Sequence, residues 1–129
     1  MIFDTDILIW VFRHDRHAAQ FVAAESDRAA SIVTLMELLA GAKSKADVKT
    51  TRQFLVDFEI RLIPITMPIS YAAANLIEDH RLADGLSITD ALIAATARET
   101  GETLATANVR HFRNIPNLAL KSFRPSRSS

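Results

Sequence analysis

The chain opens with "MIFDTDILIW" (residues 1–10), in which a short apolar run leads directly into two aspartates one residue apart. An apolar run before a D-x-D turn is typical of a buried strand that ends in a loop. The apolar residues that follow at once favour a helix starting just after the aspartates. A carboxylate beside buried apolar side chains is costly unless something compensates its charge. The placement of Asp4 and Asp6 therefore points to a special role at the end of a strand.

Composition restricts the class of protein. The chain has 129 residues, 49% of them hydrophobic and 23% charged, which fits one globular domain with a real core. It contains no cysteine, which excludes disulfides and thiolate-bound zinc and agrees with the reducing cytoplasm that we expect as its location. No apolar run reaches the roughly 18 residues of a membrane span. No basic segment precedes the first apolar stretch, so we expect neither a signal peptide nor a membrane partner.

Fifteen basic and fifteen acidic residues give a formal charge of zero, whereas nucleic-acid binders usually carry a positive excess. Basic side chains nevertheless gather in three places, for which a solvated surface is the simplest reading. If acidic residues converge in one site, however, the remaining surface is left mildly basic. The three clusters are Arg13, His14, Arg16 and His17; Arg110, His111 and Arg113; and Lys121, Arg124 and Arg127.

Apolar segments with strand character alternate with segments of helical period, which predicts an α/β fold with a mainly parallel sheet of four to five strands. Pro64 indicates that the third strand ends there or lies near an edge. Ser87 or Thr89 is the expected N-cap of the last helix, and Gly101 follows its end. The expected strands are 1–3, 29–34, 60–66, 103–108 and a short 118–123, and the expected helices are 7–15 continuing through 17–25, 35–44, 46–59, 68–84 and 87–101.

In a parallel sheet, functional groups collect at the carboxyl ends of the strands. Polar residues follow three of the predicted strands, and a further acid begins the last helix. These rim residues are Asp4, Thr5 and Asp6 after the first strand, Thr34 and Glu37 after the second, Thr106, Asn108 and His111 after the fourth, and Asp90 in the first turn of 87–101.

Each aspartate alone has a simple structural explanation, since acids are favoured at the first turn of a helix. Glu37 is harder to explain in this way, because leucines and a methionine flank it and no lysine or arginine occurs over 34–42. We therefore expect a cation to compensate it. Carboxylate oxygens prefer Mg²⁺ or Mn²⁺, and the absence of a Cys pair or an H-x-x-x-H pattern disfavours zinc. Such a site can activate water for phosphodiester hydrolysis.

Four segments together resemble the PIN-domain family, and within it the VapC-type toxins of bacterial toxin–antitoxin pairs. They are "FDTDILIW" (3–10), "SIVTLMELLAGA" (31–42), "SITDALIAATARETG" (87–101) and "LATANVRHF" (104–112). The resemblance implies a three-layer α/β/α domain over 1–123, with 124–129 as a frayed tail. It also implies an endoribonuclease that depends on Mg²⁺ or Mn²⁺, cuts RNA such as tRNA or rRNA, and is silenced by a cognate antitoxin. The protein would be a homodimer or a heteromer with that antitoxin.

Carried over residue by residue, the three family acids fall on Asp4, Glu37 and Asp90, as the catalytic and metal-binding set. Thr5 and Thr34 match small hydroxyl positions beside the site. Asp6 stands where relatives often carry Ser or Asn.

Many relatives have a fourth acid in the segment matching 106–112, where this chain offers only Asn108 and His111. This departure puts a second metal ion in doubt, and Asp6 is a candidate to compensate in part for the missing acid. Asn108 and His111 are candidates for holding a metal-bound water or for contacting phosphate, as Arg110 and Arg113 are for contacting the RNA backbone, and His111 is also a candidate general acid. Asp84 is read as a loop residue.

Two rival interpretations stay open. D-x-D after a first strand also occurs in haloacid-dehalogenase-type phosphatases, but those normally carry Thr or Val where this chain has Leu8, and their fold is longer. Alternatively, the domain is a degenerate PIN fold that only binds RNA or a protein. Most of the apolar residues of 7–12 and 54–60 are expected to be core, and Trp10 is the one expected at an interface.

Overall fold

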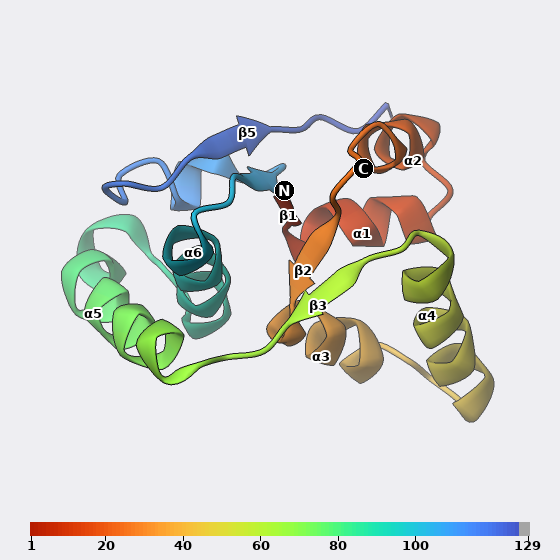
Figure 1. Ribbon diagram of the computed structural model, residues 1–129, viewed down its shortest axis with the longest axis horizontal. Helices are drawn as coiled ribbons and strands as arrows, with labels where there is room; N and C mark the ends of the chain where they lie inside the picture. Colours follow the sequence, from red (N-terminus) through yellow and green to blue (C-terminus); the bar gives the residue numbers. More distant parts are fainter. Residues whose placement is uncertain (127–129) are drawn as a thin grey trace.

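The computed structural model describes residues 1–126, which form an α/β domain around a five-stranded sheet (Figure 1). The strands lie in the order β3-β2-β1-β4-β5 and every neighbouring pair is parallel. The predicted α/β class and mainly parallel sheet are thereby confirmed. The elements are β1 (Ile2–Phe3), α1 (Thr5–Phe12), α2 (Arg16–Ala23), β2 (Ala29–Ser31), α3 (Ile32–Ala40), α4 (Lys45–Asp57), β3 (Arg61–Ile63), α5 (Met67–Asp84), α6 (Ile88–Thr100), β4 (Leu104–Thr106), a 3₁₀ turn η1 (Val109–His111) and β5 (Leu120–Ser122).

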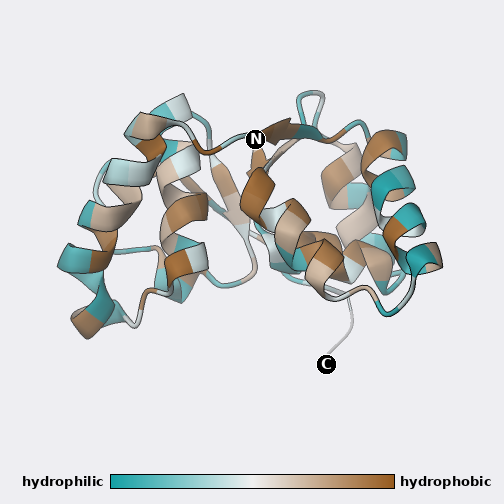
Figure 2. Ribbon diagram, turned by 90° about the horizontal axis from the view of Figure 1, so that it is seen from below, coloured by the Kyte–Doolittle hydropathy of each residue, from teal (hydrophilic) through white to brown (hydrophobic). Residues whose placement is uncertain are grey.

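The side chains of the central strands alternate between two cores, one on each face of the sheet. Ile2 and Leu104 pack with the buried residues of α5 and α6. Phe3 and Ala105 pack instead with those of α1, α2 and α4. Figure 2 shows these two groups of helices on either side of the sheet, with many of the hydrophilic turns on the outermost helices. This is the three-layer α/β/α arrangement that the sequence predicted.

The register of β1 fixes which residues meet at the carboxyl edge of the sheet. Ile2 pairs with Leu104 and Phe3 with Ala105, and the amide of Asp4 donates to the carbonyl of Ala105 at 2.9 Å. The first residue beyond β1 therefore lies beside Thr106, the last residue of β4. β2 flanks β1 on its other side, so the chain segments that follow β1, β2 and β4 meet at one edge.

The sequence predicted one continuous helical stretch after β1, but the structure has two helices. The chain breaks at His14, whose φ is +62°, and Asp15 caps α2 by accepting a hydrogen bond from the amide of Ala18 at 2.9 Å. Asp15 is fully buried and also accepts hydrogen bonds from the amide and hydroxyl of Ser126. This ties the last described residue to α2. The rest of the predicted frayed tail, 127–129, lies outside the described residues.

The second strand is shorter than predicted. β2 ends at Ser31, whose hydroxyl accepts from the amide of Val33 at 3.1 Å and so caps α3. Residues 32–34, expected to be strand, are the first turn of a helix, because an N-cap serine outweighs the β-branched residues after it. At β3 the prediction holds: this strand pairs only with β2, and Pro64 follows its last residue.

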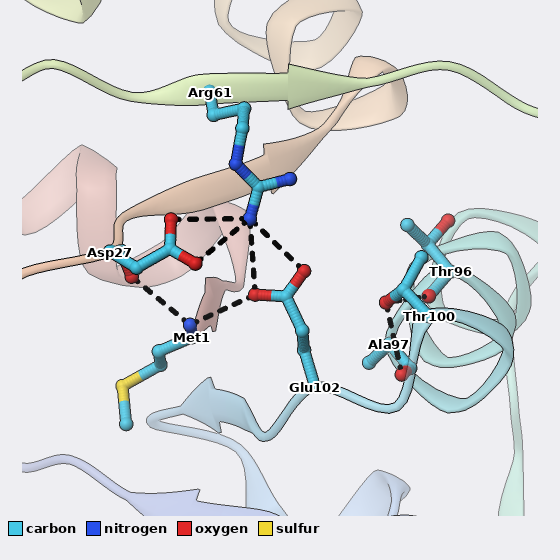
Figure 3. A network of polar contacts seen from close by, with 7 residues as sticks. All are labelled: Met1, Asp27, Arg61, Thr96, Ala97, Thr100 and Glu102. Carbon is cyan, nitrogen blue, oxygen red and sulfur yellow. Dashed lines mark hydrogen bonds and ion pairs between the residues drawn. The ribbon is translucent and has the colours of Figure 1, made fainter.

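The amino ends of the strands carry a compact charge network (Figure 3). The Arg61 guanidinium lies 3.2 Å from carboxylate oxygens of both Asp27 and Glu102. The amino group of Met1 lies 3.0 Å from Glu102 and 3.1 Å from the carbonyl of Asp27. At this edge of the sheet, each carboxylate has a positively charged partner.

Within residues 1–126, no helix combines the length and the apolar character that crossing a membrane requires.

Helix α6 is built from small residues where it meets the sheet and α5. Ala94 is completely buried in the core that α5 and α6 share, whereas Ala74 on α5 is exposed. We expect Ala94→Leu to lower the free energy of unfolding by about 1–3 kcal/mol, because a close-packed site has no room for the added carbons. Ala74→Leu is the matched control and should change it by less than about 0.5 kcal/mol. Urea unfolding measures both, and equal effects would contradict the close packing of α6.

Candidate metal and catalytic site

Asp4 is the N-cap of α1 and lies at the carboxyl end of β1. One carboxylate oxygen, Oδ1, accepts from the amide of Thr5 at 2.8 Å, and Oδ2 accepts from the hydroxyl of Thr106 at 2.8 Å. The residue is only 6% exposed. Asp4 is therefore held by both the helix that follows it and the strand beside it, which fixes the direction of its carboxylate.

Thr106 is a site residue that was not among the sequence candidates for the site, although it was placed at the rim. It is fully buried, donates to Asp4, and accepts from the amide of Asn108 at 2.9 Å. The signal in the sequence was its place at the end of a strand. The pairing of β4 with β1, which brings that hydroxyl to Asp4, could not be predicted from the sequence.

Asp6 lies in the first turn of α1, next to the same loop. Its Oδ2 accepts from the amide of Ala107 at 3.2 Å. Its Oδ1 is buried and has no hydrogen-bond partner among residues 1–126. A buried carboxylate oxygen without a partner is rare in folded proteins, so this atom calls for an explanation.

The pKa values of Asp4 and Asp6 are raised, so both side chains ionise less readily than a free aspartate. Burial raises the pKa of Asp4 to about 7, with further increases from the charges of Asp6 and Asp90, while hydrogen bonds from Thr106 and Thr5 oppose the shift. Burial also raises the pKa of Asp6 to about 6, opposed by the amides of Ala107 and Ile7 and reinforced by the charge of Asp90. Three carboxylates thus lie close enough to repel one another.

Asp90 enters this group from the other side of the sheet. It is in the first turn of α6, where its amide donates to the N-cap hydroxyl of Ser87 at 3.1 Å, and its side chain is 21% exposed. Its Oδ2 lies 3.3 Å from Nδ1 of His111, and the same ring nitrogen lies 2.8 Å from the side-chain amide of Asn108. A proton on Nδ1 is donated to Asp90, whereas an unprotonated Nδ1 accepts from Asn108. His111 and Asn108 therefore join the loop after β4 to the first turn of α6.

The environment of Glu37 differs from the buried one that the sequence suggested. Its apolar neighbours suggested a buried carboxylate, but α3 turns it outward and the residue is exposed. Thr5 donates its hydroxyl to Glu37 Oε1 at 2.7 Å, and its Oγ1 lies 2.9 Å from that of the buried Thr34. Because the Thr5 proton goes to Glu37, Thr34 is the donor to Thr5. The chain Thr34–Thr5–Glu37 extends the site from Asp4 toward α3.

The remaining sequence candidates lie around these acids. Arg110 is exposed on η1, beside His111. Asp84 is the last residue of α5 and not a loop residue as predicted, because it bonds His80 at 2.9 Å and Asn114 at 2.8 Å. Those two hydrogen bonds lower its pKa. It ties the end of α5 to the segment after η1, away from the carboxylate group.

Trp10 is half-buried against the core of α1, α2 and α4, with the Arg13 guanidinium 5.5 Å from its ring centre.

Two apolar grooves border α1 and α4 on the Glu37 side of the site. One, of about 330 Å³, is lined by Glu37 together with Phe12 and Leu38. The other, of about 540 Å³, is also lined by Phe12, with Phe54 and Phe58. The exposed residues Ile9 and Val48 add apolar surface on these helices. This surface is continuous with the polar site at Glu37.

The donors at the carboxyl edge suit a hard divalent cation. Asp4, Asp6 and Asp90 offer oxygen ligands, repel one another, and include one buried oxygen with no partner. As they stand in residues 1–126, no three side chains of the ligating types are close enough to hold an ion. Mg²⁺ can be held by one or two carboxylates with waters as its other ligands, so pairs of these acids suit it.

Known proteins share this sequence pattern and fold. The family model described as "PIN domain" matches residues 1–118. A chain of the toxin–antitoxin complex from Klebsiella pneumoniae is 33% identical, with a TM-score of 0.77, and the match covers 92% of this chain and 94% of that one. No match was found among curated proteins.

Two further structures share the fold. VapBC2 from Rickettsia felis, bound to a DNA fragment from its promoter, gives 24% identity and a TM-score of 0.78 over 96% of this chain and 100% of that one. VapBC-1 from nontypeable Haemophilus influenzae gives 21% identity and a TM-score of 0.77 over 95% and 98%.

The raised pKa values predict that the metal-free protein loses stability as pH rises. The folded state binds more protons than the unfolded state between the ordinary aspartate pKa and the raised values, so unfolding becomes easier across that window. For Asp4 alone, we expect a loss of about 3 kcal/mol between about pH 5 and pH 8. Thermal or urea unfolding in EDTA measures it.

Two variants separate this effect from other titrations. Asp4→Asn should reduce the difference between the two pH values and leave the smaller share that comes from Asp6, whereas Asp79→Asn, at an exposed position of α5, should leave the difference unchanged. Mg²⁺ or Mn²⁺ should restore stability to the parent at the higher pH. A parent that is equally stable at both values would contradict the electrostatic description of the site.

Proposed function

Because the chain belongs to the PIN-domain family, we propose that it is a metal-dependent endoribonuclease that acts as the toxin of a toxin–antitoxin pair. The observation that carries the proposal is the buried Asp4 carboxylate, held by Thr106 and facing the charge of Asp90 at the carboxyl edge of the sheet. Carboxylates kept close together have a cost in stability, and a divalent cation with a phosphate substrate gives that arrangement a use.

In this proposal, Asp4 and Asp90 would hold the ion, and Glu37 would contribute directly or through water. Bound Mg²⁺ or Mn²⁺ lowers the pKa of water and stabilises negative charge on phosphate, which favours hydrolysis to a 5′-phosphate and a 3′-hydroxyl. Thr106 and Thr5 keep the carboxylates of Asp4 and Glu37 in place through their hydroxyls.

The loop after β4 provides contacts for the substrate. Arg110 is exposed beside the site and supplies charge for the RNA backbone. His111 and Asn108 are joined to Asp90 and keep it oriented toward the ion. A tRNA or an rRNA is the substrate we propose, on the strength of the family resemblance.

The antitoxin is the partner that we propose for the apolar surface along α1 and α4. The Klebsiella pneumoniae structure with 33% identity is a toxin–antitoxin complex, and the two grooves here are lined by aromatic residues such as Phe12 and Phe54. A partner segment lying in them would end beside Glu37. We place the protein in the cytoplasm, as a heteromer with its antitoxin or as a homodimer.

One observation favours the second candidate, a degenerate domain that binds RNA or protein without cutting. Within residues 1–126, no three side chains of the ligating types lie close enough together to hold an ion. Mn²⁺ titration separates the two functions, because a binding module should show no affinity that depends on Asp4 or Asp90.

Cleavage of RNA is the direct test. With Mg²⁺ or Mn²⁺, the purified protein should cut RNA, and EDTA should abolish cutting. Asp4→Asn and Asp90→Asn should each lower the rate by roughly 100-fold or more, as expected when a direct metal ligand is lost. Gel analysis of end-labelled RNA, with mapping of the new ends, measures the rate and the position of the phosphate.

Asp47→Asn is the matched control for Asp90→Asn. Asp47 occupies the corresponding position in α4, three residues after the N-cap Ser44. The amide of Asp47 donates a hydrogen bond to the Ser44 hydroxyl at 3.1 Å. Any effect of losing a carboxylate from a first helical turn appears in both variants. Only the Asp90 variant should lose activity. Cutting that survives in both site variants would point to another nuclease.

The toxin role makes a separate prediction. Expression of the chain in a bacterium should arrest growth, and Asp4→Asn should relieve the arrest by removing the metal site. Colony counts after induction measure this, with immunoblots to show equal protein levels. Equal arrest by the parent and by Asp4→Asn would contradict a nuclease toxin.

A further inference from the structure

The buried Oδ1 of Asp6 is the one side-chain atom in residues 1–126 that is enclosed without a hydrogen-bond partner. We propose that Asp6 is a further ligand of the cation, with Oδ1 directed at the ion, and that it takes the place of the acid absent from 106–112. The inference deepens the proposed function and rests on it. Asp6 would then be a fourth carboxylate of the site, provided by α1 and not by the loop after β4.

The orientation of Asp6 is fixed by its other oxygen. Oδ2 accepts from the amide of Ala107 at 3.2 Å, so the carboxylate cannot rotate freely to expose Oδ1 to solvent. The amide of Ile7 lowers the pKa of Asp6, but it donates its hydrogen bond to the main-chain oxygen of Asp4 at 3.2 Å. Oδ1 is thus left as an acceptor inside the site, with its second oxygen anchored.

The loop segment 106–108 arranges the whole group. Thr106 binds Asp4 through its hydroxyl, Ala107 binds Asp6 through its amide, and Asn108 binds His111, which contacts Asp90. Three consecutive residues therefore orient three different parts of the site. A segment that carries no acid still directs the acids of α1 and α6 toward one another.

Charge also distinguishes Asp6 from a purely structural first-turn acid. The charge that acts on Asp6 is that of another carboxylate, Asp90, and Asp6 in turn acts on Asp4. A carboxylate adds repulsion here, which a cation between these groups would convert into attraction.

Metal affinity tests the inference without relying on activity. Mn²⁺ binding is measured by calorimetry and by electron paramagnetic resonance on the parent, Asp6→Asn, Asp4→Asn and Asp79→Asn. Asp6→Asn keeps an oxygen for the Ala107 amide and removes only the charge. We expect it to weaken Mn²⁺ binding roughly 10- to 100-fold, while the exposed control Asp79→Asn binds like the parent.

The outcomes separate this inference from the proposed function. If Asp4→Asn weakens Mn²⁺ binding but Asp6→Asn and Asp6→Ser both bind within about twofold of the parent, a difference below 0.5 kcal/mol, Asp6 is not a ligand and the nuclease proposal stands. If the parent binds no Mn²⁺ and cuts no RNA, both proposals fail. Circular dichroism in EDTA shows which variants are folded, and Asp6→Ser serves if Asp6→Asn is not.

Discussion

The hydrogen bond between Asp4 and Thr106 joins residues 102 positions apart in the sequence, and the site depends on it. It forms because β1 and β4 pair in a register that places the residue after Phe3 beside the last residue of β4. Asp4 also begins α1, so one carboxylate fixes both the direction of a helix and the position of a loop. Burial makes this carboxylate costly to ionise. The proposed cation would offset that cost, so the same carboxylate serves both the fold and the proposed chemistry.

Acidic residues have opposite charge environments at the two edges of the sheet. At the amino edge, Asp27 and Glu102 share the Arg61 guanidinium, so those charges are neutralised within the chain. At the carboxyl edge, Asp4 is acted on by the negative charges of Asp6 and Asp90. Acids of the first kind support the fold. The acids at the carboxyl edge repel one another and so lower the stability of the metal-free fold. This pattern is expected of a functional site that binds a cation.

The sequence was sufficient for the fold class because its main signals were local. Alternating apolar strands and helices predicted the parallel sheet, and the four segments led to the PIN-domain family, which the family model confirms over residues 1–118. The boundary of β2 was wrong because a capping serine at Ser31 is a stronger signal than the apolar residues after it. The helix break at His14 was missed because the residues on both sides of it have helical spacing, although Asp15, the N-cap of α2, is a local signal for it.

The same division holds for the candidate site. The predicted rim residues Asp4 and Asp6 lie beside the loop after β4 because strand order brings these segments to one edge, and Asp90 joins them from the first turn of α6. The exposure of Glu37 could not be read from its apolar neighbours, since the rotation of α3 follows from where its N-cap lies. The part played by Thr106 depended on β1–β4 register, which no local pattern in the sequence specifies.

Small residues in α6 explain how Asp90 reaches the other acids. Ala91, Ala94 and Ala95 are fully buried in the core between α6 and the sheet. Alanine side chains let a helix axis approach a sheet more closely than leucine or phenylalanine would. The first turn of α6, capped by Ser87, is therefore brought toward the ends of β1 and β4. Close packing of one apolar helix thus fixes the distance between carboxylates on different elements, and through it the repulsion that a bound cation would relieve.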